Sequence, residues 1–164
     1  MKTEVRLQID RKVKFADEHG FGDAGPYERL VGRVHFGLDP EEAGNRNIVD
    51  LDLAPRNERG LVEFSCDLDI LKPVDLSRGN RRILYDVNNR GNRTVLRACN
   101  DAPAAADPTS IGSAGNGFLM RSGYTVVWSG WQGDLVPGVG LLTADLPEAL
   151  EQGQRVRGKV RQEF

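Results

Sequence analysis

Hydrophobic and polar residues alternate with a period of two along much of the first half of the chain. Such alternation predicts strands with one buried and one exposed face, as in antiparallel sheets. Turn-forming residues separate the alternating segments, notably at residues 20–26 and 55–60. The pattern therefore predicts four strands that form an antiparallel sandwich-like or meander unit, at residues 5–15, 30–38, 49–53 and 62–70.

The last of these segments alternates most regularly. Its apolar positions share one parity and are expected to face one core: Val62, Phe64, Cys66, Leu68 and Ile70. Its polar positions are expected to point outward: Glu63, Ser65 and Asp67. We also expect two carboxylate pairs to lie on exposed strand faces, Asp50 with Asp52 and Asp67 with Asp69. There they either keep the strands soluble and unpaired or hold a Ca²⁺ ion.

The pattern changes near residue 80. Residues 83–87 and 124–128 are short, nearly continuous apolar runs, typical of parallel strands covered on both faces. About 35 residues separate them, enough for the crossover that parallel strands need. Within this connecting segment, residues 101–117 predict a long loop, and residues 118–123 predict the last turn of a helix, closed by Gly123. Residues 142–150 fit either one helical turn or a strand, and alternation returns at residues 155–164.

Composition and charge narrow the classes of function. The 164 residues are 39% hydrophobic and 28% charged, as in a globular domain. With 22 basic against 24 acidic residues, the net charge is −2, and no basic face for nucleic acid is predicted. No window approaches the ~18 apolar residues of a membrane span, so a cytoplasmic location is expected.

Cofactor and metal sites are not expected either. Cys66 and Cys99, the only cysteines, lack the spacing of a zinc site. Cys66 lies in an alternating apolar row and is interpreted as a small core residue.

A strand, a polar glycine-containing turn, a crossover and a second strand follow one another over residues 83–134. This arrangement resembles the front part of the α/β-hydrolase fold, and more narrowly a largely uncharacterised family of esterase-like proteins with a β-rich N-terminal extension. The stretches that carry the resemblance are GPYERLVG (25–32), NIVDLDLAP (47–55), ILYDVNNRGN (83–92) and GNGFLMRSGYTVVWSGWQGD (115–134).

The resemblance implies a mixed, β-rich α/β fold. A β-rich N-terminal unit would occupy residues 1–78, and the first strands of a hydrolase-like sheet, with a trailing β segment, would occupy residues 79–164.

The resemblance also assigns a role to the turn after the first apolar strand. In hydrolases this loop supplies a backbone N–H to the oxyanion hole, where each donor is worth about 3–4 kcal/mol. Gly91 allows the close-approach backbone that such a loop needs. The alternative is a plain polar turn, in which Asn and Gly are favoured because they tolerate positive φ. The oxyanion-loop candidates are Asn88, Asn89, Arg90 and Gly91.

The loop after the second apolar strand is expected to share the substrate cleft with this turn. Trp131, in a glycine-rich turn, is a candidate for a pocket wall, whereas Trp128 is interpreted as a core residue. The cleft candidates are Ser129, Gly130, Trp131, Gln132 and Gly133.

A catalytic nucleophile is not identifiable in the chain. No Gly-x-Ser-x-Gly elbow occurs: Ser113 lies in a glycine-flanked segment one residue too short, and Ser129 lacks the preceding glycine. His19 lies in a turn and His35 on the polar row of its strand, so neither is predicted to be a general base. The resemblance implies that Ser, acid and His follow residue 164 in a longer protein, which would act on a small ester-type substrate. This chain alone is expected to be inactive.

Two functions remain open from the sequence. The first is an N-terminal portion of a hydrolase, and the alternative is a non-catalytic β-rich binding or oligomerisation module. The length of the complete reading frame separates them, because a hydrolase domain needs roughly 200 further residues. In either case an incomplete parallel sheet leaves an open apolar edge, so we expect a dimer or larger assembly.

Overall fold

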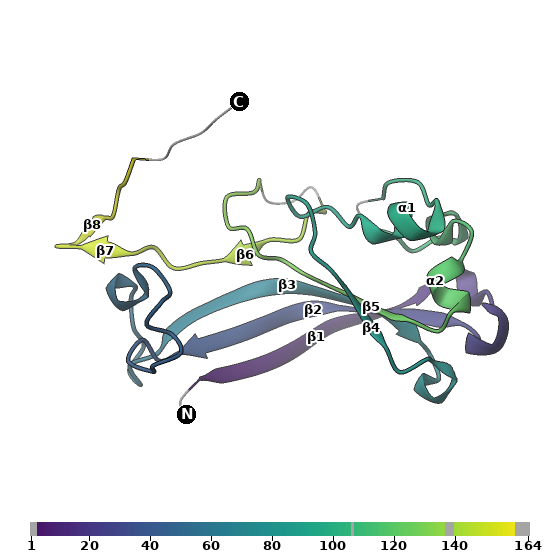
Figure 1. Ribbon diagram of the computed structural model, residues 1–164, viewed down its shortest axis with the longest axis horizontal. Helices are drawn as coiled ribbons and strands as arrows, with labels where there is room; N and C mark the ends of the chain where they lie inside the picture. Colours follow the sequence, from purple (N-terminus) through teal and green to yellow (C-terminus); the bar gives the residue numbers. More distant parts are fainter. Residues whose placement is uncertain (1–2, 106, 137–139, 160–164) are drawn as a thin grey trace. The chain divides into compact units, whose positions relative to one another are not determined.

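The computed structural model of the protein describes residues 3–105, 107–136 and 140–159 (Figure 1). The longer strands are β1 (Glu4–Phe15), β2 (Tyr27–Leu38), β3 (Val62–Pro73), β4 (Ile83–Asp86) and β5 (Thr125–Ser129). Three strands have two residues each: β6 (Ala144–Asp145), β7 (Leu150–Glu151) and β8 (Gln154–Arg155). The α-helices are α1 (Val95–Asn100) and α2 (Phe118–Arg121). Short 3₁₀ turns occur at Ala16–Glu18, Gly22–Ala24, Leu51–Leu53, Leu76–Arg78 and Ile111–Ala114.

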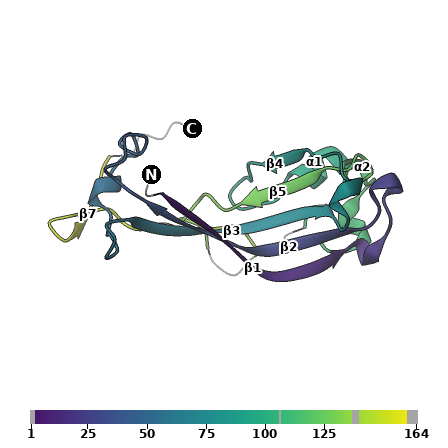
Figure 2. The same cartoon turned by 90° about the horizontal axis from the view of Figure 1, so that it is seen from below.

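The main sheet has the strand order β1-β2-β3-β5-β4, and β6 pairs with β3. The first three strands are therefore neighbours in chain order, and their arrows alternate in direction (Figure 1), so three of the four strands predicted for a meander are found in that arrangement. Figure 2 shows β1 and β4 at opposite edges of the sheet. Strands β7 and β8 form a separate antiparallel hairpin.

Strands β4 and β5 are parallel neighbours, as their apolar runs predict. In their register Leu84 lies beside Val126 and Asp86 beside Trp128. Strand β3 runs antiparallel to β5 and places Asp69 opposite Trp128. Since cross-strand partners share one face of a sheet, Asp69, Trp128 and Asp86 form one row across three strands.

The described chain forms two compact units. The larger unit comprises Leu7–Val34 and Cys66–Ala144, and the smaller unit comprises Met1–Arg6, His35–Ser65 and Asp145–Phe164. The predicted division into residues 1–78 and 79–164 stays a prediction.

The core of the larger unit lies between its sheet and the crossover. Helix α1 contributes Leu96, and α2 contributes Leu119 and Met120, to a cluster that includes Tyr27 and Trp128. Burying such side chains stabilises the fold by roughly 1.5–3 kcal/mol each. The crossover segment between the two parallel strands therefore covers one face of the sheet.

The end of α2 explains how the chain enters β5. Gly123 has φ +73°, and its N–H donates to Met120 O, while Tyr124 N donates to Leu119 O. This pair of bonds is the Schellman motif, which favours glycine because the left-handed region carries no Cβ penalty there. The predicted glycine-closed helix end is confirmed.

The predicted strand at residues 49–53 is wrong. Asp50 adopts a left-handed conformation, φ 58° and ψ 15°, and Leu51–Leu53 forms a 3₁₀ turn. This turn directs Leu51 into the small core of the smaller unit, with Ala54 and Val62. A three-residue alternation is also compatible with a turn that buries one side chain, and here tertiary packing decides the outcome.

The strand predicted at residues 62–70 is confirmed, but the prediction that only one of its faces is buried is wrong. Three apolar side chains are buried as expected: Val62, Cys66 and Leu68. However, Ser65, expected to point outward, is buried, and Asp69 and Leu71 are completely buried on the opposite face. The crossover packs on that face, so most of β3 is covered on both sides, and the exposed-face interpretation of Asp69 is wrong.

Apolar side chains remain exposed at both edges of the sheet. In β4, Ile83 is 70% exposed and Tyr85 50% exposed, so the prediction of two covered faces is wrong for this strand. In β1, the alternating residues Val5, Leu7 and Ile9 are also exposed. Edge strands have a neighbour on one side only, which leaves more of each side chain in contact with solvent.

Residues 144–155 form only short strands. Neither alternative for residues 142–150 holds over the segment: it contains no helical turn, and its only strand residues are Ala144–Asp145 and Leu150, the first residue of β7. Of the alternating tail predicted at residues 155–164, only Arg155 lies in a strand, residues 156–159 are irregular and exposed, and residues 160–164 lie outside the described chain.

Candidate functional site

The turn after β4 is a tight two-residue reversal. Arg90 has φ 48° and Gly91 has φ 78°, so both central residues are left-handed. Asn92 N donates to Asn89 O at 3.0 Å, and Asn89 N donates to Asn92 O at 3.3 Å. Two left-handed central residues define a type I′ turn, which favours glycine at the second position. The local sequence Asn-Arg-Gly-Asn therefore fixes the shape of this loop.

Gly91 lies against the returning chain. A Cβ atom here would be 2.8 Å from both Leu141 Cβ and Leu142 O. Leu142 N also donates to Gly91 O at 3.0 Å. The expected close approach at Gly91 is thus present, and its neighbour is the protein's own backbone.

The three candidate N–H donors of the turn differ in their partners. Asn89 N–H donates to Asn92 O, and Gly91 N–H donates to Asn88 Oδ1 at 2.9 Å. Within the described residues, Arg90 N–H has no hydrogen-bond acceptor. A donor that the protein has already satisfied cannot serve an oxyanion, so Arg90 is the candidate donor of this loop.

Asn88 joins the loops that follow β4 and β5. Its side chain is buried, and its Nδ2 donates to Ser129 O while its Oδ1 accepts from Gly91 N. Its own carbonyl accepts from Trp131 Nε1 at 3.0 Å. These bonds hold the buried amide in one orientation, because breaking any one of them would leave a buried polar group unsatisfied. Asn88 is therefore a positioning residue that ties the two predicted loops together.

The cleft candidates after β5 differ in exposure. Trp131 is 52% exposed, and Gly133 is also exposed, whereas Trp128 is fully buried, as its core interpretation predicts. The hydroxyls of Tyr85 and Ser129 share a hydrogen bond of 2.5 Å on the surface.

The backbone of this second loop is held against residues 143–144. Gly130 N donates to Asp67 O, and a Cβ on Gly130 would be 2.0 Å from Thr143 O. Ala144 N donates to Gln132 O at 2.9 Å. Among the described residues, the buried Oε1 of Gln132 has no hydrogen-bond partner.

Asp86 anchors the start of the crossover, a role that the sequence did not reveal. Its carboxylate accepts from Trp128 Nε1 at 2.7 Å and from the backbone N–H groups of Thr94 and Val95 at 2.9 Å. Val95 is the first residue of α1, so Asp86 satisfies free donors at a helix N-terminus. The feature of the sequence that could have indicated this role is a charged residue within an otherwise apolar strand.

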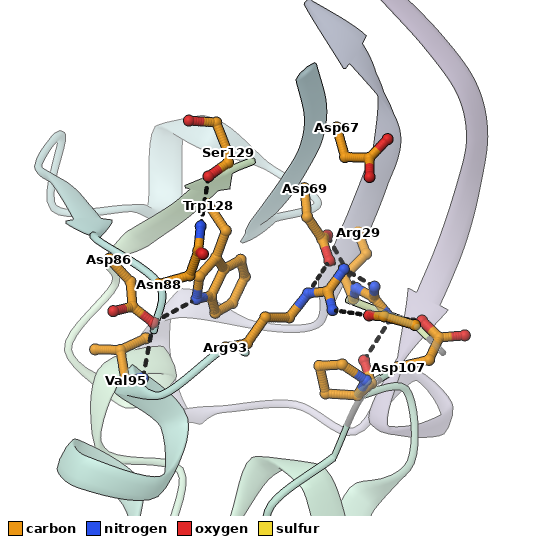
Figure 3. A network of polar contacts seen from close by, with 12 residues as sticks. Arg29, Asp67, Asp69, Asp86, Asn88, Arg93, Val95, Asp107, Trp128 and Ser129 are labelled. Carbon is orange, nitrogen blue, oxygen red and sulfur yellow. Dashed lines mark hydrogen bonds and ion pairs between the residues drawn. The ribbon is translucent and has the colours of Figure 1, made fainter. Parts of the chain in front are cut away.

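Arg29, Asp69 and Arg93 form a buried ion network beside this site (Figure 3). Arg29 pairs with Asp69 through both carboxylate oxygens, at 3.1 and 2.6 Å, and Arg93 Nε donates to Asp69 Oδ2 at 2.7 Å. The Arg29 and Asp69 side chains are 1% and 0% exposed. Although burial alone would lower the pKa of the Arg29 guanidinium, its bonds to Asp69 hold that pKa above its usual value. Arg29 therefore stays cationic, and the carboxylate of Asp69 that it shares with Arg93 holds Arg93 in place directly after the turn that follows β4.

Asp107 links this network to the long loop and gives a pH-dependent prediction. Its Oδ1 accepts from Arg29 Nη1 at 2.7 Å. Burial raises the pKa of the Asp107 carboxyl, but the Arg29 charge and hydrogen bond outweigh it and lower that pKa. A lowered pKa means that the bond stabilises the fold fully above about pH 3.9 and is lost as pH falls through the lowered value.

We therefore expect Asp107→Asn to have a lower free energy of unfolding than wild type at neutral pH. In acid, where the Asp107 carboxyl is protonated, the two proteins should be equally stable. The difference should be under about 1 kcal/mol, because Asp107 is 53% exposed. Urea titrations at neutral pH and below about pH 3 measure it. A difference that stayed constant over this range would contradict the assignment.

Of the residues considered for nucleophile and base, Ser129 ends β5 and accepts a hydrogen bond from Asn88, and the other three have different neighbours. His19 packs edge-on against Phe21 with ring centroids 5.0 Å apart. Ser113 is buried and shares a hydrogen bond with Ser110 at 3.2 Å. His35 lies in β2, within the smaller unit. The absence of a catalytic triad from this chain stays a prediction.

Neither a metal-binding group nor a membrane helix emerges from the described residues. No three or more His, Cys, Asp or Glu side chains within residues 3–105, 107–136 and 140–159 are grouped to hold a metal ion. In the same residues no helix is long and apolar enough to cross a membrane. Comparison with protein families, with curated proteins and with solved structures finds no match to this chain.

Proposed function

We propose that residues 83–134 provide the oxyanion loop and part of the substrate cleft of an esterase-like α/β-hydrolase. In this proposal the nucleophile, the acid and the histidine lie on a further segment of the protein. The observation that carries the proposal is the open N–H of Arg90, at the loop that leaves the parallel strand β4. Ligands of open α/β sheets collect beyond the carboxyl ends of their parallel strands.

The chemistry follows from where charge develops in acyl transfer. Attack on an ester carbonyl places negative charge on its oxygen, and a fixed backbone N–H lowers the barrier by about 3–4 kcal/mol. Three contacts fix the backbone around Arg90. Asn89 and Asn92 exchange backbone hydrogen bonds across the I′ turn, Gly91 N–H donates to Asn88 Oδ1, and Gly91 packs against residues 141–142. A donor that does not reorganise during the reaction is the kind that electrostatic catalysis requires.

The alternative is a non-catalytic β-rich binding or oligomerisation module. It is favoured by exposed apolar side chains at this edge of the sheet: Ile83 and Tyr85 in the edge strand β4, and Val87 directly after it. Exposed apolar edges promote association between chains. Ester turnover by the complete protein separates the two functions, because only the hydrolase function predicts it.

The chain as given is expected to hydrolyse short acyl esters no faster than background. A serine hydroxyl is a weak nucleophile until a base accepts its proton, and no such pair was identified in the sequence. Release of p-nitrophenol from its acetate and butyrate esters measures this. Turnover that survives extensive purification and disappears in Ser113→Ala or Ser129→Ala would contradict the proposal that the nucleophile lies elsewhere.

A further inference from the structure

Strand β1 has one edge that no other strand of the described chain covers, along a strand of 12 residues. This edge lies at the side of the sheet opposite β4 (Figure 2). Along it Val5, Leu7 and Ile9 are 65%, 54% and 40% exposed. An uncovered edge strand presents unpaired backbone N–H and C=O groups, and exposed apolar side chains favour association. Strand β1 therefore has both features of a surface that pairs with a further strand.

The backbone of β1 determines which residues present hydrogen-bonding groups to the open edge. A Cβ added to Gly32 in β2 would clash with Gln8 O, so the Gln8 carbonyl points toward β2. In an antiparallel sheet both polar backbone groups of a residue point to one side, and those of the next residue point to the other side. Leu7 and Ile9 therefore direct their N–H and C=O groups toward the open edge.

The charged residues at the even positions of β1 are complementary to the same strand in reverse. They are exposed, and in chain order they are Glu4, Arg6, Asp10 and Lys12. If a second copy of β1 runs antiparallel with Gln8 opposite Gln8, Arg6 of each copy lies opposite Asp10 of the other, and Glu4 lies opposite Lys12. Each pair occurs twice because the arrangement is symmetric. Opposite charges that face each other across two strands stabilise their pairing.

The neighbouring registers bring like charges together. The bonding groups of two strands can meet only if the second copy is moved by an even number of residues. A shift of two residues in one direction places Arg6 opposite Lys12, and the same shift in the other direction places Glu4 opposite Asp10. Like charges directly opposite each other destabilise a sheet. Charges on an edge strand often keep it unpaired, but the order of the charges in β1 selects one register for self-pairing.

We propose that the protein forms a symmetric dimer in which the β1 strands of two copies pair antiparallel, with Gln8 on the two-fold axis. Leu7 of each copy then lies opposite Ile9 of the other, and the two exposed apolar rows become neighbours on one face. The interface extends the sheet at the edge opposite β4, so it is independent of the proposed hydrolase function, which rests on the turn after β4.

The inner pair of charges sets the register. The outer charges already form ion pairs in their own chain, Glu4 with Arg59 and Lys12 with Glu28. Asp10 instead accepts a hydrogen bond from the neutral amide of Gln8 at 2.7 Å, which leaves its negative charge uncompensated by that bond. A second copy places the Arg6 guanidinium opposite this carboxylate.

Charge reversal tests the register in the full chain by sedimentation velocity. Asp10→Arg places arginine opposite arginine at both inner pairs and should raise the dissociation constant of the dimer by about 10–100-fold. Adding Arg6→Asp restores opposite charges in the same register, so the double variant should dimerise as wild type does. Asp52→Arg is the matched control, because it makes the same charge change at an exposed position outside β1. A monomeric wild type, a dimer that Asp10→Arg leaves unchanged, or no recovery in the double variant would overturn the proposal.

Disulfide cross-linking tests the two-fold axis independently. Two residues facing each other in a non-hydrogen-bonded antiparallel pair have Cα atoms about 4.5 Å apart, within the range of about 4.4–6.8 Å that a disulfide spans. With the exposed cysteine removed by Cys99→Ser, Gln8→Cys should yield a disulfide-linked dimer on mild oxidation. Leu7→Cys is the matched control, since Leu7 faces Ile9 and its two copies lie diagonally, too far apart for a disulfide. Equal cross-linking by both variants, or none by Gln8→Cys, would contradict the proposed pairing.

Discussion

Asp69→Ala is expected to lower the free energy of unfolding by about 3–5 kcal/mol, because it leaves the buried guanidinium of Arg29 without its main partner. Arg93, 7% exposed, would lose the same partner. Domains of this size are stable by about 5–15 kcal/mol in total. The substitution should therefore remove a large share of the stability, measurable as a shift of the urea midpoint.

An exposed ion pair supplies the control for this prediction. Glu41 pairs with Arg56 at 3.1 Å, with side chains 72% and 36% exposed. Because water screens such pairs, Glu41→Gln should change stability by less than about 1 kcal/mol. If Asp69→Ala and Glu41→Gln had equal effects, Asp69 would not be the buried centre of the network.

Local signals predicted the parallel pair of strands and the end of α2. Continuous apolar runs at residues 83–87 and 124–128 indicated parallel strands, and their spacing indicated a crossover, although one of the two strands lies at the sheet edge. Gly123 marked the position where the chain turns left-handed. Each signal depends on residues that are close together in the sequence, so single-sequence reasoning can detect it.

The burial of Asp69 could not be predicted in the same way. Its partners Arg29 and Arg93 lie 40 and 24 residues away in the sequence. Alternation marks which residues of β3 share a face, but it does not reveal that the segment between β4 and β5 covers the second face. Alternation therefore predicted an exposed position for Asp69, whereas the fold makes it the shared ion-pair partner of two arginines.

The candidate site could likewise be predicted only where its signals are local in the sequence. Asn88 and Gly91 were recognisable, since a polar glycine turn after an apolar strand has a known geometry. The bonds of Asn88 to Ser129, and of Asp86 to Trp128 and Val95, depend on the register between β4 and β5. Sequence reasoning thus identified the two loops but not the side chains that hold them together.

The central claim is that the turn after β4 is an oxyanion loop, and Gly91→Ala tests it in the protein expressed from the complete reading frame. The added Cβ would lie 2.8 Å from Leu142 O, in a backbone of φ +78°. The loop must shift, and Arg90 N–H moves with it. Losing one oxyanion donor lowers kcat by about 10²–10³-fold, with KM nearly unchanged, since the interaction is made in the transition state.

Gly60→Ala is the matched control, because Gly60 also has positive φ, +80°, but has no atom within 4 Å of an added Cβ. The decisive measurement is kcat for p-nitrophenyl acetate in the complete protein and in these two variants, with folding checked by circular dichroism. The account predicts measurable turnover, a fall of about 10²–10³-fold in Gly91→Ala and near wild-type turnover in Gly60→Ala. Wild-type kcat in Gly91→Ala, or no ester turnover by the complete protein, would contradict it.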